Sequence, residues 1–280
     1  MKKLCFLVVI FALSFFSGFA QQKAAVLKVL AIGNSFSEDA VENNLYDLAK
    51  AANKPIIIGN MYIGGAPIDL HVKNANSNKE AYRYRKIYEN GEKKTTNKVS
   101  LEEAIGDEDW DYISLQQASP LSGNYQVIME GLPQLVKYVS EHAPKANLIY
   151  HQTWAYQHNS THKGFSNYNS DQNVMYQAIM DATRRISKSG DFKFVVPAGT
   201  AIQNARTSSI GDNFTRDGYH LQLAYGRFTA ACAWYEKLFR SDVRKNPYKP
   251  ASVTDLEASI AKEAAHKAAK RPFRVTKVRL

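Results

Sequence analysis

Residues 26–38 read Val-Leu-Lys-Val-Leu-Ala-Ile-Gly-Asn-Ser-Phe-Ser-Glu. The first seven residues form a nearly continuous apolar run, which is typical of a strand buried on both faces of a parallel sheet. Gly33 permits a tight turn after this strand, and a helical pattern begins directly after the turn. Ser35 therefore stands where a buried strand ends and a helix begins, with its hydroxyl exposed above the sheet. The alternative is that Ser35 or Ser37 merely caps the helix.

Short apolar runs recur along the chain and predict further strands. Together with Val26–Ile32 they are Ile56–Tyr62, Tyr112–Leu115, Leu148–His151 and Phe192–Val196. Helical patterns fall between and after these runs, at 38–52, 133–142, 173–186 and 221–239. This alternation predicts one doubly wound α/β domain, whose functional loops lie at the carboxyl ends of the strands.

The composition indicates an ordinary folded protein. The chain has 280 residues, of which 45% are hydrophobic and 22% charged, so a disordered chain and a disulfide-stapled miniprotein are excluded. The formal net charge of +10 suits an acidic glycan partner, and it suits plain solubility equally well. No aromatic-basic recognition motif points to a nucleic acid partner.

The first 20 residues predict export. Two lysines precede the short apolar stretch Leu4–Phe16, and Gly-Phe-Ala at 18–20 is a small-x-small cleavage site. We expect a signal peptide over 1–20 and a single periplasmic or extracellular domain over 21–280, without a stable membrane anchor. The alternative, an N-terminal membrane anchor, is disfavoured because the apolar run is short for a bilayer. Cleavage would leave Cys232 alone, so no internal disulfide is expected.

A second group of polar residues precedes the helix predicted at 221–239. Asp217 and His220 lie three residues apart in a glycine-containing turn. A serine hydroxyl needs a base to accept its proton, and the base needs an acceptor that fixes its tautomer. His220 and Asp217 can fill these two roles for Ser35. The alternative is an aspartate that caps a helix beside a histidine of the core.

Two segments can supply hydrogen bonds to a reacting oxygen. Gly64 and Gly65 follow the second predicted strand, where a glycine lets a backbone N–H approach a ligand. Gln116 and Gln117 follow the third strand, and an amide side chain there can donate to an oxyanion, with Gln117 the better candidate. The alternatives are an ordinary glycine-rich turn and a surface glutamine.

Several other segments have two readings each. Trp154 and Tyr156 follow the fourth predicted strand and can stack on a sugar face, or Trp154 belongs to the core. His71 borders the pocket or lies in the first turn of a helix. The segment 74–100 is a long insertion over the site, or a mobile loop with a short helix. The polar loop 157–170 is a lid or rim, and its histidines lack the spacing of a metal site.

These motifs together resemble the SGNH (GDSL-like) hydrolases. The resemblance rests on Gly-Asn-Ser-Phe-Ser at 33–37, the glycine after the second strand and Asp217-x-x-His220, and it extends from about residue 28 to 239. The match is nearest to a branch of secreted bacterial proteins with the block Gly-Asn-Ser-Phe-[Ser/Thr]. It implies a flavodoxin-like three-layer αβα sandwich with a five-stranded parallel sheet. A further helix with a capping box, expected at 254–270, would pack on its outside.

The resemblance also implies ester hydrolysis that needs no metal or organic cofactor. Ser35 would be the nucleophile, His220 the base and Asp217 its orienting partner. The N–H groups of Ser35 and Gly65 would form the oxyanion hole together with a side chain of the family's third motif block, which here is the segment after the third predicted strand. The usual third block is Gly-x-Asn-Asp, and this chain has glutamines there instead. Glutamine can donate the same hydrogen bond, as in sialic-acid-esterase-like relatives. The expected substrate contacts are Asn34, Gly64, Gln116, Trp154, Tyr156 and His71.

The sequence therefore predicts an exported serine esterase that acts on esterified polysaccharides or oligosaccharides. Acetyl groups are the first expectation, and methyl esters of uronic acids are the second. Two alternatives remain open. One is a glycan-binding protein that has lost catalysis on the same fold. The other is a lipase or thioesterase of the same superfamily.

Overall fold

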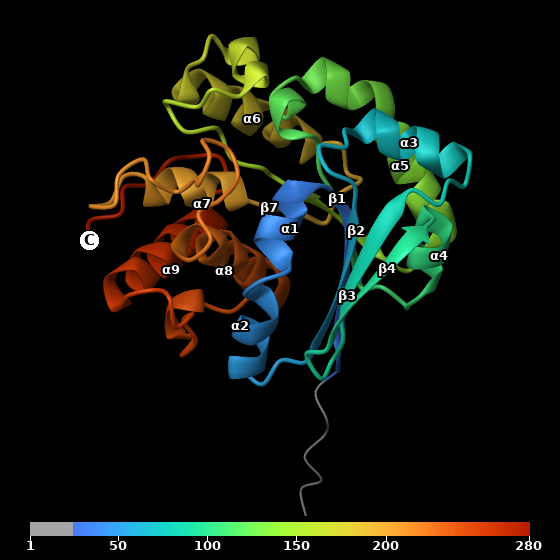
Figure 1. Ribbon diagram of the computed structural model, residues 1–280, viewed down its shortest axis with the longest axis horizontal. Helices are drawn as coiled ribbons and strands as arrows, with labels where there is room; N and C mark the ends of the chain where they lie inside the picture. Colours follow the sequence, from blue (N-terminus) through green and yellow to red (C-terminus); the bar gives the residue numbers. More distant parts are fainter. Residues whose placement is uncertain (1–24) are drawn as a thin grey trace, which may run out of the picture.

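The computed structural model describes residues 25–280, which form one sheet between two layers of helices (Figure 1). The signal peptide predicted for residues 1–20 lies outside the described residues. The strand order is β4-β3-β2-β1-β5-β6-β7. All five predicted strands are present and pair in parallel, which confirms the α/β fold class. They are β1 (Leu27–Gly33), β2 (Ile56–Tyr62), β5 (Tyr112–Leu115), β6 (Asn147–His151) and β7 (Phe194–Val196).

The predicted strand number of five was wrong, because the segment 74–100 extends the sheet. It contains β3 (Tyr82–Ile87) and β4 (Lys93–Val99), which pair antiparallel with each other and continue from β2. The signal was present in the alternating Tyr-Arg-Tyr-Arg of 82–85 and in the turn at Asn90-Gly91, where Gly91 has φ +88°. β4 is the edge strand, and its polar side chains are exposed, as is usual for strand edges that avoid further pairing.

The parallel strands bury side chains on both faces. Along β1, Val29 and Ala31 pack into one hydrophobic cluster, and Leu30 and Ile32 pack into the other. Successive residues of a strand point to opposite faces, so an apolar run of this kind needs helices on both sides. The polar side chains of this region therefore gather at the strand ends.

The two helical layers are visible on either side of the sheet in Figure 1. The first layer contains α1 (Ser35–Val41), α2 (Leu45–Ala51), α7 (Ala198–Ala205), α8 (Tyr225–Phe239) and α9 (Asp255–Lys270). The second contains α3 (Ile68–Asn76), α4 (Leu101–Gly106) and α5 (Tyr125–His142). Helix α6 (Gln172–Ile186) contributes to both hydrophobic clusters. Short 3-10 turns lie at η1 (Ser119–Leu121), η2 (Lys163–Tyr168) and η3 (Val243–Lys245).

Some helix boundaries differ from the predicted ones. The helix expected at 38–52 is divided into α1 and α2. The helix expected at 133–142 begins at Tyr125, so Pro133 lies inside it rather than in its first turn. The capping box of Thr254 and Glu257 opens α9 as predicted. Among the helices of residues 25–280, none combines the length and apolar character needed to cross a lipid bilayer.

Candidate active site

Ser35, His220 and Asp217 form a continuous hydrogen-bonded chain. Ser35 is the first residue of α1, directly beyond β1, and its Oγ lies 2.9 Å from Nε2 of His220. Nδ1 of His220 lies 2.6 Å from Oδ2 of Asp217. The other oxygen of Asp217 accepts the backbone N–H groups of Tyr219 and His220, at 3.2 and 2.8 Å. The three residues are thus brought together in the order expected for a nucleophile, its base and an orienting carboxylate.

The Asp217 carboxylate is held in its charged form. Burial alone would raise its pKa, but the hydrogen bonds from the His220 side chain and from two backbone N–H groups lower the pKa of Asp217 below its ordinary value. A carboxylate only accepts hydrogen bonds, so Nδ1 of His220 carries a proton. In the neutral ring Nε2 is then free to accept the proton of Ser35.

A cavity of about 370 Å³ opens over this chain of hydrogen bonds. Ser35, His220, Gly64 and Gly65 all line it. Gly65 has φ +66°, a conformation that favours glycine, and a Cβ atom built there would meet no atom within 4 Å. The predicted glycine segment therefore lines the same cavity as Ser35. Ser35 and Gly65, whose backbone N–H groups were expected to form the oxyanion hole, both belong to the cavity wall.

Four of the six expected substrate contacts do not line this cavity: Trp154, Tyr156, His71 and Gln116. Trp154 is fully buried, stacks on Phe36 at 4.3 Å between ring centroids, and donates its Nε1–H to the Tyr219 carbonyl. Tyr156 is also fully buried, with its hydroxyl 2.8 Å from Oγ of Ser119. His71 lies on α3 inside the second helical layer. Burial stabilises large aromatic rings, and all three rings lie in the interior.

Among the other residues that line the cavity are Tyr62, Tyr219 and His162, which were not predicted to contact substrate. Tyr62 is the last residue of β2, and Tyr219 lies inside the Asp-x-x-His block. Both positions adjoin motifs that the sequence predicts to be catalytic, and this adjacency could have identified them. His162 comes from the loop 157–170. The loop was expected to be a lid or a rim, and His162 places it at the rim of the cavity. The loop is joined to the turn of His220, because the Gln157 N–H donates to the Gly218 carbonyl.

The turn that carries Ser35 is held by Asn34. Oδ1 of Asn34 accepts the Phe36 N–H at 2.9 Å, which caps α1, and Nδ2 donates to the Ala66 carbonyl at 3.0 Å. Asn34 also lines the cavity. Its amide therefore joins the nucleophile turn to the glycine segment after β2.

Gln116 and Gln117, which follow β5, do not line the cavity, and their side chains bond to residues around it. Gln116 Nε2 donates to Asn34 Oδ1 at 2.9 Å, and its oxygen lies 2.7 Å from Nδ1 of His151. Gln117 Oε1 accepts the N–H groups of Ile68, the first residue of α3, and Ala118. The expected substrate contact of Gln116 and the expected oxyanion contact of Gln117 are therefore replaced by bonds that position Asn34 and α3.

Residues 28–268 match the model of a family described as a domain of unknown function, DUF4886. The chain belongs to this family. A DUF4886 family protein from Bacteroides uniformis shares 49% sequence identity and a TM-score of 0.89 with it, over 91% of this chain and 98% of that one. A protein from Parabacteroides merdae, described as a GDSL-like lipase, has a TM-score of 0.52 at 14% identity, over 77% and 96% of the two chains. That likeness shows a common fold. No curated protein sequence matches the chain significantly.

In this DUF4886 chain a buried aspartate joins the two halves of the site. Asp39 lies on α1 and is 1% exposed. Its carboxylate accepts hydrogen bonds from the side chains of Arg216 and Arg227 and from the Leu221 N–H, at 2.8–3.2 Å. Arg216 and Leu221 flank the Asp217–His220 turn, so Asp39 fixes the helix of the nucleophile against the turn of the base.

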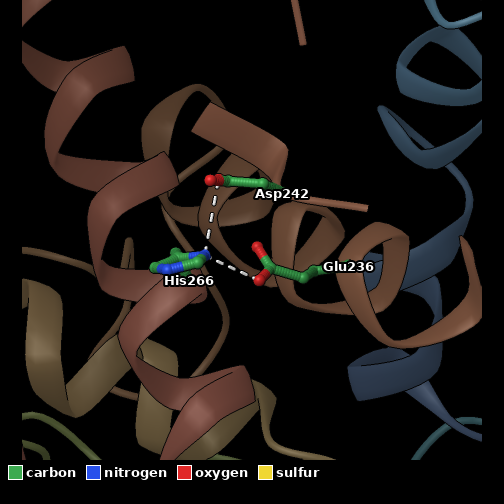
Figure 2. Close-up of side chains that lie close together, drawn as sticks. All are labelled: Glu236, Asp242 and His266. Carbon is green, nitrogen blue, oxygen red and sulfur yellow. Dashed lines mark hydrogen bonds and ion pairs between the residues drawn. The ribbon is translucent and has the colours of Figure 1, made fainter. Parts of the chain in front are cut away.

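One cluster of three side chains within residues 25–280 has the composition of a metal site: Glu236, Asp242 and His266 (Figure 2). Nδ1 of His266 lies 2.7 Å from Glu236 and 3.4 Å from Asp242. The second oxygen of Glu236 accepts the Val243 N–H, and Asp242 is bound by the Arg244 guanidinium. These donor atoms are engaged with one another, so the cluster connects α8, η3 and α9 and is assigned no metal.

Two buried histidines of the DUF4886 chain predict a loss of stability in acid. Burial lowers the pKa of His71 to about 4 and that of His151 to about 3, from 6.5. Below pH 6.5 the unfolded chain binds protons that the native chain does not. The free energy of unfolding should therefore fall as the pH is lowered from 6.5 towards 4, by up to about 1.4 kcal/mol per pH unit for each histidine.

Urea unfolding between pH 7 and pH 5 measures this dependence. His71→Gln should show a shallower pH dependence than the wild type, because one titrating group is lost. His142→Gln, at an exposed position of α5, is the matched control and should keep the wild-type slope. Equal slopes in all three proteins would show that His71 does not contribute.

Proposed function

We propose that this protein is a serine ester hydrolase. The observation that carries the proposal is the hydrogen-bonded order Ser35–His220–Asp217 at the wall of an open cavity. Ser35 Oγ attacks the ester carbonyl carbon while Nε2 of His220 takes its proton. The tetrahedral intermediate collapses, the C–O bond of the ester breaks, and the alcohol leaves with the proton from His220. Water then attacks the acyl-enzyme with His220 as base, which releases the acid and restores Ser35.

The negative charge of the intermediate is stabilised by the backbone N–H groups of Ser35 and Gly65. Backbone donors are already in place before the reaction, so they stabilise the transition state without reorganisation. Gly65 lines the cavity, and its positive φ is a backbone conformation that favours glycine. We assign no oxyanion contact to Gln117, since its side chain is held by the start of α3.

As substrate we propose an esterified carbohydrate outside the cytoplasm, with an acetyl group as the first choice. The volume of about 370 Å³ suits a short acyl group with one sugar ring. The tyrosine rings at 62 and 219 give the wall apolar faces for a sugar. The intact chain of hydrogen bonds favours catalysis over the binding-only alternative. Export rests on the sequence of residues 1–20 alone.

Release of nitrophenol from the acetate, butyrate and octanoate esters tests this proposal, together with acetate release from acetylated xylan. Turnover that is greatest for acetate and depends on Ser35 supports the esterase. Turnover that rises with chain length supports a lipase or thioesterase instead. Saturable binding of the polysaccharide without release of acid, in a protein inert towards all four esters, supports the binding protein.

Replacing Asp217 by asparagine should lower kcat by about 10²- to 10⁴-fold with little change of fold. Asparagine keeps the size of the side chain, but its NH₂ group can donate to Nδ1 of His220 and favour the wrong tautomer. The measurement is kcat for 4-nitrophenyl acetate. Asp69→Asn is the control, because Asp69 pairs with Lys73 on the exposed side of α3. An Asp217→Asn variant with wild-type kcat would remove Asp217 from the mechanism.

A further inference from the structure

His162 is a second histidine at the cavity, and its tautomer can be read from its contacts. Nδ1 of His162 accepts the Gly164 N–H at 3.0 Å, which caps the start of η2. A backbone N–H can only donate, so Nδ1 carries no proton in this arrangement. The neutral ring must then carry its proton on Nε2. His162 therefore offers one hydrogen-bond donor from a half-buried ring that lines the cavity.

The surroundings of His162 disfavour the protonated form of its ring. Burial lowers its pKa, the nearby His220 lowers it further when protonated, and Asp217 opposes the change. During the proposed reaction it is His220 that becomes positively charged. The neutral form of His162, with its proton on Nε2, is thus favoured while His220 is charged.

The place of His162 identifies which part of the ester it can meet. Its ring packs edge-to-face on Tyr219 at 4.7 Å between centroids, and Tyr219 packs on His220 at 4.2 Å. The leaving oxygen must lie within reach of Nε2 of His220, because this atom returns the proton. The alcohol part of the ester therefore departs along the wall that Tyr219 and His162 form beside His220.

We propose that Nε2–H of His162 binds a hydroxyl group of the alcohol part of the substrate, and that this alcohol is a sugar. A sugar ring has an apolar C–H face for the Tyr219 ring and hydroxyl groups at its edge for the imidazole. A simple alkyl alcohol has no group for this donor. The inference rests on the proposed esterase activity and specifies its substrate class.

The two nitrogens of His162 can be separated by mutation. Asparagine places a carbonyl oxygen near the position of Nδ1, so His162→Asn keeps an acceptor for Gly164 and removes the Nε2 donor. Glutamine places an NH₂ group near the position of Nε2, so His162→Gln keeps the donor and removes the cap. A purely structural role of His162 predicts that asparagine is the better replacement, and substrate binding predicts that glutamine is.

The experiment compares kcat/KM for a mono-O-acetylated methyl xylopyranoside with kcat/KM for 4-nitrophenyl acetate. The ratio of the two should fall about 3- to 10-fold in His162→Asn, the effect of one hydrogen bond to a neutral hydroxyl, and recover in His162→Gln. His142→Gln, the exposed histidine variant, should keep the wild-type ratio. Thermal unfolding of each variant shows that the fold is retained.

The outcomes separate this inference from the proposed function. A wild-type protein that hydrolyses neither ester contradicts the esterase itself. Two outcomes overturn only the role of His162, provided that the wild type cleaves both esters through Ser35. In one, both His162 variants keep the wild-type ratio. In the other, asparagine preserves the ratio better than glutamine does. A wild type that cleaves 4-nitrophenyl acetate but not the sugar ester overturns the sugar as the alcohol part.

Discussion

The Ser35→Ala protein is expected to lose about 10⁴-fold or more of the wild-type kcat for acetate esters while it remains folded. Alanine lacks the Oγ atom, which in the proposed mechanism is the atom that forms the covalent bond to the acyl group. Ser35 is partly exposed and its Oγ bonds only with His220 in the contacts described above, so little packing is lost. Kinetics and the melting temperature of the same preparation provide the measurement.

Ser37→Ala is the matched control for this experiment. Ser37 lies two residues further along α1 and is buried, with its hydroxyl 2.8 Å from both the Asn34 carbonyl oxygen and Asn60 Oδ1. Its loss should lower stability and leave the nucleophile in place, the opposite pattern to Ser35→Ala. Adding His220→Ala to Ser35→Ala should cause little further loss, because the two residues act as one unit. Full activity of Ser35→Ala would refute the proposed mechanism.

Among the substitutions considered, Asp39→Asn is expected to lower stability most, by about 3 kcal/mol in the free energy of unfolding. Removing one partner of a buried ion pair leaves the other charge uncompensated. Here one carboxylate, almost fully buried, faces both Arg216 and Arg227. Their guanidinium groups are partly exposed, with 33% and 16% of the side-chain surface accessible, so water recovers part of the cost.

Urea unfolding at pH 7 measures this effect, with Asp255→Asn as the control. Asp255 also pairs with a cation, Lys249, but its side chain is 94% exposed, and its replacement should leave the unfolding midpoint unchanged. The kcat of Asp39→Asn should fall as well, since the turn of His220 loses its anchor on α1. Equal stability of the two variants would contradict the clamping role of Asp39.

The parallel strands could be predicted from the sequence because each is a short apolar run buried on both faces. Their carboxyl ends meet at one edge of the sheet, so Ser35 and the glycines at 64 and 65 could be placed near one another without a structure. His220 and Asp217 could be named because a serine needs a base and the base needs an acceptor. This reasoning depends on chain order and on chemistry that is local to each motif.

The rest of the site depends on the orientation of side chains, which no local sequence pattern determines. Trp154 lies just beyond β6 and Tyr62 ends β2, but Trp154 stacks on Phe36 in the interior whereas Tyr62 lines the cavity. Gln117 turns towards the start of α3, which is 49 residues away in the sequence. The ion pair of Asp39 with Arg216 joins residues 177 apart. Such contacts follow from how the helices pack on the sheet, and packing is decided by the whole chain.

The hydrogen bond between Ser35 and His220 spans 185 residues. A growing polypeptide therefore presents its serine long before the histidine that would activate it has been synthesised. Contacts between such distant parts of a chain form late, after the intervening loops have closed. On the proposed mechanism, the nascent protein cannot cleave esters until its C-terminal half has packed on the sheet.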